Sequence, residues 1–296
     1  MQKVIFIQLS RKLMMIKKSL LILFFTLISF KFAVAVTFPT ASPVPGGIAI
    51  IKLHSNFDNE SKVYFWKKRV LTRNINNTWQ ALVGLPLKIK PGVHKIKIIN
   101  KNGQKKSLEF SVHNKDYETR HITVNKNRMG LKNKKDIARY LKEKPLIVSA
   151  LKTWTDNSDI QTNFIHPVKG RFSSAFGLKR IYNKQKRIRR HTGLDIAAPT
   201  GTAINSPAKG KVIRTGDYFF TGNTVFIDHG QGLISMYCHL DKTAVIAGQE
   251  LAQGENIGTV GMTGRVSGPH LHWVVSLNNT KVDPKLFITF NDSKKQ

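Results

Sequence analysis

The chain has 296 residues, and its 41% hydrophobic content supports packed cores and argues against wholesale disorder. Because the length exceeds a typical single domain of roughly 100–150 residues, we expect two domains. The formal net charge of +31 favours polyanionic partners such as nucleic acid, anionic lipid or an acidic wall polymer, unless the lysines are simply spread over solvated faces.

The amino terminus indicates export. Lys17 and Lys18 precede an apolar-rich run over residues 20–30, and small residues follow at 33–35. This pattern predicts a signal peptide over residues 1–35, cleaved near Ala35; an uncleaved anchor in the inner membrane is the alternative. After cleavage we expect no stable membrane span. Export also argues against nucleic acid as the partner of the positive charge. The expected compartment is a Gram-negative periplasm, with secretion as a further alternative.

Residues 36–124 have the pattern of an amino-terminal β-domain. Short segments rich in β-branched and aromatic residues alternate apolar with polar positions, and turn sequences such as Pro91-Gly92 and Asn102-Gly103 separate them. A small β-sandwich is the expected fold. The segments expected to form strands are 48–53, 62–66, 93–98, 108–112 and 121–124.

Residues 125–163 read as a helical connector. The segment 134–143 lacks Gly and Pro and predicts a helix, Pro145 is expected to break it, and a second short helix is expected over 146–154. A structural connector is favoured over a regulatory lid.

Residues 164–296 predict a second domain that is entirely β. Glycines punctuate many short strand-like pieces, and no helical period of any length follows His166. The fold class that we expect is therefore mainly β: an amino-terminal sandwich, a short helical connector and a carboxy-terminal antiparallel domain.

The carboxy-terminal segment holds the side chains of a zinc site. His191 and Asp195 lie four positions apart, and His270 and His272 occupy alternate positions, where strand side chains share a face. Zinc accepts imidazole and carboxylate ligands and, with three of them, keeps a position for water. One histidine of the pair can bind the metal while the other reaches the water or the substrate. His239, on another strand-like piece, can serve beside them.

Six sequence blocks, in order, resemble the lysostaphin- or LytM-type zinc endopeptidases, which cut peptide links in peptidoglycan. The resemblance covers residues 164–288, and residues 43–47, 79–86 and 90–94 resemble the β-domain that precedes some of these enzymes. It implies Zn²⁺ bound by His191, Asp195 and His272, with His239 and His270 as catalytic histidines. The blocks are His191-x-Gly-x-Asp195, Gly201-Thr-Ala, residues 222–230, Tyr237-x-His239-Leu, residues 258–264 and Ser267-Gly-Pro-His-Leu-His272.

The implied activity is a D,D-endopeptidase that hydrolyses D-alanyl amide cross-links between peptidoglycan stem peptides. The alternative is a non-catalytic wall-binding regulator of other hydrolases, although such relatives lose ligands and this chain keeps all five site positions. A regulatory protein partner is compatible with either reading.

The loop over residues 179–190 carries seven cations immediately before His191. We expect Arg187, Arg189 and Arg190 to bind carboxylates of the stem peptides, with a solvated hairpin tip as the alternative. Other polar or reactive side chains near the motifs are interpreted as structural, namely Asp217, Asp228, His229, Tyr237 and the single cysteine, Cys238.

Overall fold

The computed structural model describes residues 38–54, 57–123, 133–183 and 188–289. Residues 37–296 belong to one compact unit. The expected signal peptide lies outside the described residues. Among the residues that the structure describes, none of the helices has the length and hydrophobicity needed to cross a bilayer.

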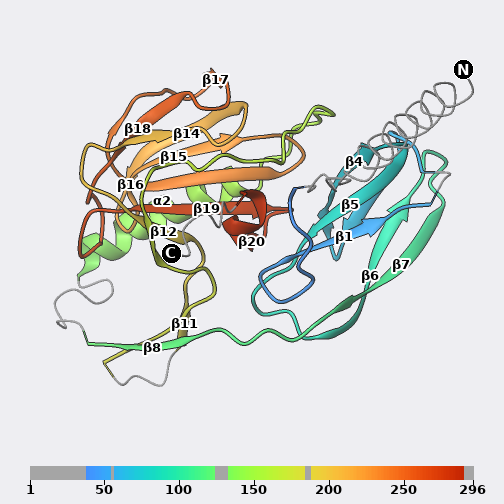
Figure 1. Cartoon of the computed structure of the whole chain (residues 1–296), viewed down its shortest axis with the longest axis horizontal. Helices are drawn as coiled ribbons and strands as arrows, with labels where there is room; N and C mark the ends of the chain where they lie inside the picture. Colours follow the sequence, from blue (N-terminus) through green and yellow to red (C-terminus); the bar gives the residue numbers. More distant parts are fainter. Residues whose placement is uncertain (1–37, 55–56, 124–132, 184–187, 290–296) are drawn as a thin grey trace, which may run out of the picture. The chain divides into compact units, whose positions relative to one another are not determined.

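The amino-terminal part is a β-sandwich, as predicted (Figure 1). Its two sheets, ordered β1-β5-β4 and β3-β2-β6-β7, share a core that includes Phe65, Val83 and Ile96. Side chains alternate between this core and solvent, which explains the alternating sequence pattern. The strands are β1 (Ile48–Lys52), β2 (Lys62–Phe65), β3 (Lys68–Arg69), β4 (Leu71–Ile75), β5 (Thr78–Gly84), β6 (Gly92–Ile99) and β7 (Lys105–Val112).

The carboxy-terminal part is built on a large antiparallel sheet, which confirms the predicted fold class. Its main path runs β17-β14-β15-β16-β19-β12-β9, with β13, β18 and β20 paired at its sides. The elements are β9 (Arg171–Ser174), β12 (Leu194–Ala197), β13 (Ala203–Asn205), β14 (Gly210–Tyr218), β15 (Gly222–Asp228), β16 (Leu233–Thr243), β17 (Glu250–Leu251), β18 (Asn256–Val260), β19 (Leu271–Leu277), β20 (Lys281–Val282) and the 3-10 helix η2 (Pro284–Phe287).

The two faces of this sheet contact different layers. Tyr237 and Trp273 point into the main core, whereas their neighbours Met236 and Val274 pack with the helix α2 (Lys134–Leu151). Side chains alternate along a strand, so consecutive residues serve both layers. Both faces of the central strands are therefore buried, which accounts for their continuous apolar runs.

The expected break at Pro145 is wrong, because α2 is one continuous helix with Pro145 inside it. Asn133 caps its start by accepting a hydrogen bond from the Asp136 amide. Proline removes one internal hydrogen bond and normally disfavours a helix interior. Burial of Ala150 and Leu151 against the sheet continues the helix past the proline.

A third, small sheet connects the segment after the sandwich to the carboxy-terminal part. In it β8 (Thr119–Ile122) pairs in parallel with β10 (Lys179–Tyr182), which pairs antiparallel with β11 (Ile188–Arg190). Just before β8, the Tyr117 ring lies against Gly177, where an added Cβ would approach the ring to 2.0 Å. Residues 117–122 are thus fixed to β10, whose partner β11 leads directly into His191.

Candidate metal centre and active site

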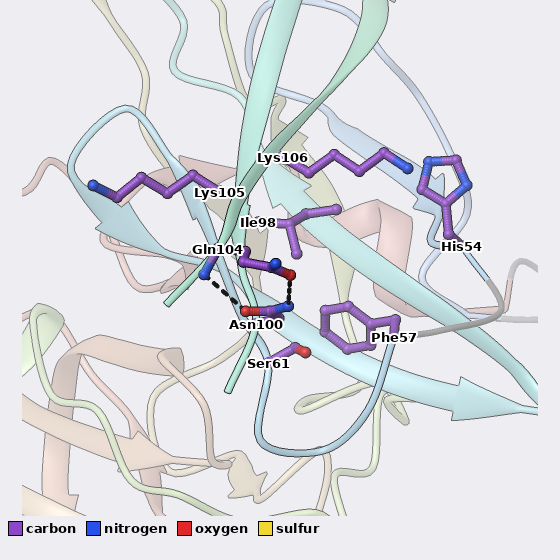
Figure 2. Close-up of a pocket in the computed structure, with 8 residues that line it drawn as sticks. All are labelled: His54, Phe57, Ser61, Ile98, Asn100, Gln104, Lys105 and Lys106. Atoms are coloured by element: carbon purple, nitrogen blue, oxygen red, sulfur yellow. Dashed lines mark hydrogen bonds between the residues drawn. The ribbon is translucent and has the colours of Figure 1, made fainter. Parts of the chain in front are cut away.

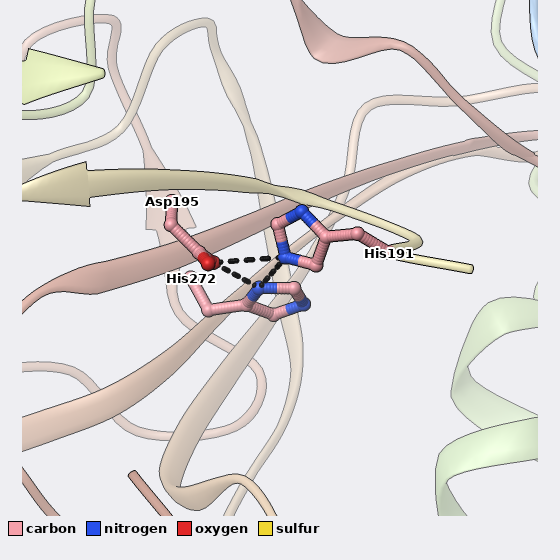
Figure 3. Close-up of side chains that lie close together, drawn as sticks. All are labelled: His191, Asp195 and His272. Carbon is pink, nitrogen blue, oxygen red and sulfur yellow. Dashed lines mark hydrogen bonds and ion pairs between the residues drawn. The ribbon is translucent and has the colours of Figure 1, made fainter. Parts of the chain in front are cut away.

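Three side chains converge in the carboxy-terminal sheet (Figure 3). His191 Nε2 lies 3.0 Å from Asp195 Oδ1, and His272 Nδ1 lies 2.6 Å from the same oxygen. The two imidazole nitrogens are 3.1 Å apart. The three ligand atoms therefore form a compact triangle, the arrangement from which a single metal ion can be held.

Strand pairing brings these side chains together. Asp195 on β12 is the register partner of His272 on β19, so both side chains emerge on one face of the sheet. His191 ends the segment that leads into β12, and its backbone pairs with Gly177 and Leu178. Gly193 leaves room for the His272 ring, because a Cβ there would lie 2.5 Å from His272 Cε1. Steric contact with the His272 ring thus explains why the His-x-Gly-x-Asp motif has glycine at position 193.

The proton positions in the triangle fit a metal ion. His191 Nδ1 lies 2.8 Å from the carbonyl oxygen of Ala175, which can only accept, so Nδ1 carries the proton. In the neutral ring Nε2 then presents a lone pair toward the Asp195 carboxylate. A cation bound between these atoms would remove the repulsion between the Nε2 lone pair and the carboxylate oxygen. Tetrahedral bonds of roughly 2.0 Å separate ligand atoms by roughly 3.3 Å, close to the observed spacing.

The second oxygen of Asp195 has partners of its own. Arg180 Nη2 lies 3.1 Å from Asp195 Oδ2 and donates to Ser174 Oγ at 2.7 Å. Burial alone would raise the pKa of the Asp195 carboxyl, but without a metal His191 and His272 can take up protons, and their hydrogen bonds and positive charge then outweigh burial, so the pKa lies well below its usual value. The carboxylate therefore stays ionised, with Oδ1 facing the histidines.

Two further histidines border the triangle. The ring centroids of His239 and His270 are 5.0 Å apart, and His270 Nε2 lies 3.8 Å from Asp195 Oδ1. His239 Nδ1 donates to the Thr263 carbonyl oxygen at 2.9 Å, and His270 Nδ1 donates to that of Gly268 at 2.9 Å. Each neutral ring therefore keeps its Nε2 as a proton acceptor. His270 precedes β19 rather than lying on it.

His239 adopts a strained backbone conformation. Its φ is +68°, a left-handed region that costs a non-glycine residue about 1 kcal/mol or more. Its amide donates to the Thr221 carbonyl oxygen, and with the bond to Thr263 this fixes the ring. Burial, together with the nearby His272 and His270, lowers the pKa of His239 to about 3. The ring is therefore neutral at neutral pH.

The arginines expected to bind substrate are placed only in part. Arg187 lies outside the described residues. Arg189 and Arg190 are exposed on β11, with guanidinium carbons 5.8 Å and 5.7 Å from the ring centroids of Tyr182 and Tyr117. Their proposed contact with substrate carboxylates stays a prediction.

Residues interpreted as structural have internal partners. Buried His229 donates from Nδ1 to the Lys209 carbonyl oxygen and accepts at Nε2 from Ser235 Oγ. Asp217 pairs with Arg139, and Cys238 is buried, which raises the pKa of its thiol to about 12. An ionised, reactive thiolate is therefore disfavoured at neutral pH.

Sequence reasoning missed Arg180 as a member of the site. It was one of seven cations in the loop, and nothing in the spacing distinguished it from the others. Only the strand pairing that returns β10 toward Asp195 selects it. The carbonyl partners of the histidines were also invisible in the sequence, because backbone oxygens carry no residue signature.

A separate pocket of about 410 Å³ lies in the sandwich (Figure 2). Asn100 and Gln104 in it bond each other, and Ser61 bonds Asp58. The side chains of Ser61, Asn100 and Gln104 thus have partners within the sandwich. It brings together no set of titratable groups comparable to the His/Asp cluster, so we place the chemistry at that cluster.

Comparison with known proteins agrees with this geometry. Residues 189–284 match peptidase family M23, and residues 41–115 match the peptidase family M23 N-terminal domain. A solved structure from Pseudomonas aeruginosa, described as a peptidase M23, is 38% identical with a TM-score of 0.70; the match covers 84% of this chain and 96% of that one. The chain belongs to peptidase family M23. The resemblance stated from the sequence motifs is thereby confirmed.

The names of two curated relatives of this M23 peptidase state an activity. Peptidoglycan DD-endopeptidase ShyA of Vibrio cholerae is 39% identical over 115 residues, which are 39% of this chain and 27% of that protein. DD-carboxypeptidase/endopeptidase Mpg of Neisseria meningitidis serogroup B is 40% identical over 114 residues, 38% of this chain and 26% of that protein. The match spans about a quarter of the length of these curated relatives.

Proposed function

We propose that this chain is a zinc-dependent peptidoglycan endopeptidase that hydrolyses D-alanyl amide cross-links between stem peptides. The observation that carries the proposal is the triangle of His191 Nε2, Asp195 Oδ1 and His272 Nδ1, with two further imidazoles beside it. The names of the curated relatives support the substrate and the bond.

His191, Asp195 and His272 would hold zinc as a set of two nitrogens and one oxygen, which suits this ion. When bound, zinc lowers the pKa of a water molecule toward neutrality and polarises the carbonyl of the bond to be cut. The protein groups keep this ligand set rigid: the Ala175 carbonyl orients His191, and Arg180 holds the outer oxygen of Asp195.

Proton transfer is assigned to the flanking histidines. In the neutral tautomer that donates from Nδ1, each ring has an Nε2 without a proton, so either can accept one from the attacking water and return it to the leaving amine. Because the pKa of His239 is lowered to about 3, His239 is a weak base. We therefore assign the proton to His270 and a water-orienting role to His239.

The cellular setting is part of the proposal. The amino-terminal sequence predicts export, and we propose that the protein acts in the Gram-negative periplasm, with secretion or retention on the inner membrane as alternatives. Cationic Arg187, Arg189 and Arg190 would attract the carboxylates of stem peptides. Replacing these three arginines together should then weaken cleavage with a marked salt dependence.

Digestion of purified sacculi tests the activity. Residues 37–296, which form one compact unit, are incubated with zinc, and the products are analysed by mass spectrometry. Cross-linked dimers should be converted to monomers whose masses identify the bond. The Asp195→Ala variant should lose at least about a hundredfold in rate. Asp217→Ala removes an exposed carboxylate paired with Arg139 and should cut normally.

The outcome separates the two classes of function. Equal, undetectable cleavage by the unaltered protein and Asp195→Ala, although zinc is bound by the unaltered protein, would contradict the endopeptidase and favour a wall-binding regulator. Cleavage of a different bond would retain the peptidase and correct its specificity.

A further inference from the structure

Helix α2 has a second apolar face that nothing described in the protein covers. Ile137, Leu141 and Val148 are 42%, 59% and 37% exposed. Their spacing of four and seven positions places them in one row, which passes over exposed Pro145. Ala150 lies on the opposite side of the helix, and Leu151 borders the row at its last turn; both pack against the sheet. Leu146, 39% exposed, lies outside the row. We call the row of Ile137, Leu141, Pro145 and Val148 the outer stripe.

The charges around the outer stripe have one sign. Lysines are exposed on both sides of it, whereas the two acidic residues of α2 are half-buried. Glu143 accepts hydrogen bonds from Arg139 and from the Phe219 amide, on the side that meets the sheet domain. The solvent face of the helix is therefore apolar along its middle and cationic at its margins. The exposed lysines are Lys134, Lys135, Lys142, Lys144 and Lys152.

A hollow continues this face at the end of the helix. Pro145, Val148, Ser149, Lys152 and Thr153 line an open depression of about 550 Å³. Two residues of the outer stripe thus border a concave space that also carries a lysine. A ligand with an apolar chain and an anionic group would match both the apolar residues and the lysine that line this depression.

We propose that the outer stripe and its lysines dock on an anionic lipid surface. A helix that is apolar on one side, with lysines at the margins, binds at the interface of a bilayer, where apolar side chains enter the acyl boundary and lysines meet anionic headgroups. A second copy of the chain fits poorly, because the same lysines would face each other. A purely acidic polymer would leave the apolar row in water.

The side of α2 that meets the sheet is compatible with this contact. Ile147, Ala150 and Leu151 remain packed on the peptidase sheet while the outer stripe faces away from it. No residue of the outer stripe belongs to the His/Asp cluster. Lipid binding can therefore be measured independently of peptidase activity.

Vesicle sedimentation with residues 37–296 tests the proposal. This unit omits the amino-terminal apolar run, which could bind lipid by itself. The probes are vesicles of phosphatidylethanolamine and phosphatidylglycerol in a 3:1 ratio (about 25% anionic lipid) and vesicles of pure phosphatidylcholine. We expect binding to the first and not to the second, with affinity that falls as salt rises.

Matched variants distinguish binding through the outer stripe from general attraction by positive charge. The triple variant Ile137→Ser, Leu141→Ser, Val148→Ser should weaken binding by roughly tenfold or more. The control variant Val93→Ser, Ile246→Ser removes apolar side chains that are 63% and 73% exposed elsewhere, and it should bind as the unaltered protein does. Near-ultraviolet circular dichroism establishes that each variant is folded.

Three results would overturn the proposal: no sedimentation with anionic vesicles, equal binding by the stripe variant and the control variant, or equal binding to neutral vesicles. Equal binding by the variants would reduce the interaction to unspecific charge attraction. A dimer that light scattering detects without lipid, and that only the stripe variant loses, would instead assign the outer stripe to contact between two copies.

Discussion

Arg180 determines how Asp195 presents its carboxylate. The guanidinium takes Oδ2 and leaves Oδ1 toward His191 and His272, so the carboxylate can act as a ligand through one oxygen. A positive charge so close to a metal site also opposes cation binding. The orienting effect must exceed this repulsion if Arg180 serves the site, and the two effects predict opposite outcomes on its removal.

We expect Arg180→Met to lower zinc affinity by about 10- to 100-fold, because groups that orient metal ligands typically contribute that much. Competition with a chromophoric chelator at constant pH measures the affinity directly. Lys179→Met, on the adjacent position of β10 whose side chain points to the other face, should bind zinc normally. Unchanged or tighter binding by Arg180→Met would show that charge repulsion outweighs orientation.

His229 illustrates a buried imidazole with a structural task. Tyr237 and Ser235 hydroxyls lie 2.8 Å apart, and Ser235 Oγ lies 2.7 Å from His229 Nε2, so the neutral ring ends a chain of hydrogen bonds. The His229 Nδ1 donates to the carbonyl oxygen of Lys209. Burial lowers the pKa of His229 to about 4 from 6.5.

This shift predicts acid sensitivity. Because the unfolded state takes up the proton near pH 6.5 and the folded state only near pH 4, the contribution to stability is complete above pH 6.5 and is lost as pH falls through that interval. We expect a loss on the order of 2 kcal/mol between pH 7 and 5, measured by urea unfolding with metal chelated. His229→Gln can keep both hydrogen bonds and should lack that part of the pH dependence. An identical slope in both proteins would contradict the assignment.

At the scale of elements, the sequence predicted what local pattern controls. Alternating apolar residues identified strands such as β2 and β6, and the His and Asp motifs identified the converging triangle. Pro145 misled the helix prediction because burial of Ala150 and Leu151 is a tertiary effect that local preference does not contain. The parallel pairing of β8 with β10 joins residues about sixty positions apart, and no local signal specifies such a partner.

At the scale of the molecule, the sandwich and the peptidase sheet share one core. Leu71 and Leu82 of the sandwich belong to the same apolar cluster as Leu277 and Val282. Beside this cluster, the Asn278 side chain accepts from the Gly84 amide at 2.6 Å and donates to the Gly84 carbonyl oxygen at 3.2 Å. Asn278 thus replaces a strand partner for β5. The two parts identified from the sequence are therefore coupled energetically rather than only tethered.

This coupling predicts that residues 37–296 unfold in a single calorimetric transition. Asn278→Ala should lower the free energy of unfolding by about 1–3 kcal/mol, because both polar groups of Gly84 lose their buried partner. The loss of asparagine at a φ of +44° adds to the cost. Asn163→Ala, at an exposed position, should have little effect. Two separated transitions in the unaltered protein would mean that the sandwich and the peptidase sheet fold independently, and that the shared core contributes too little to join them.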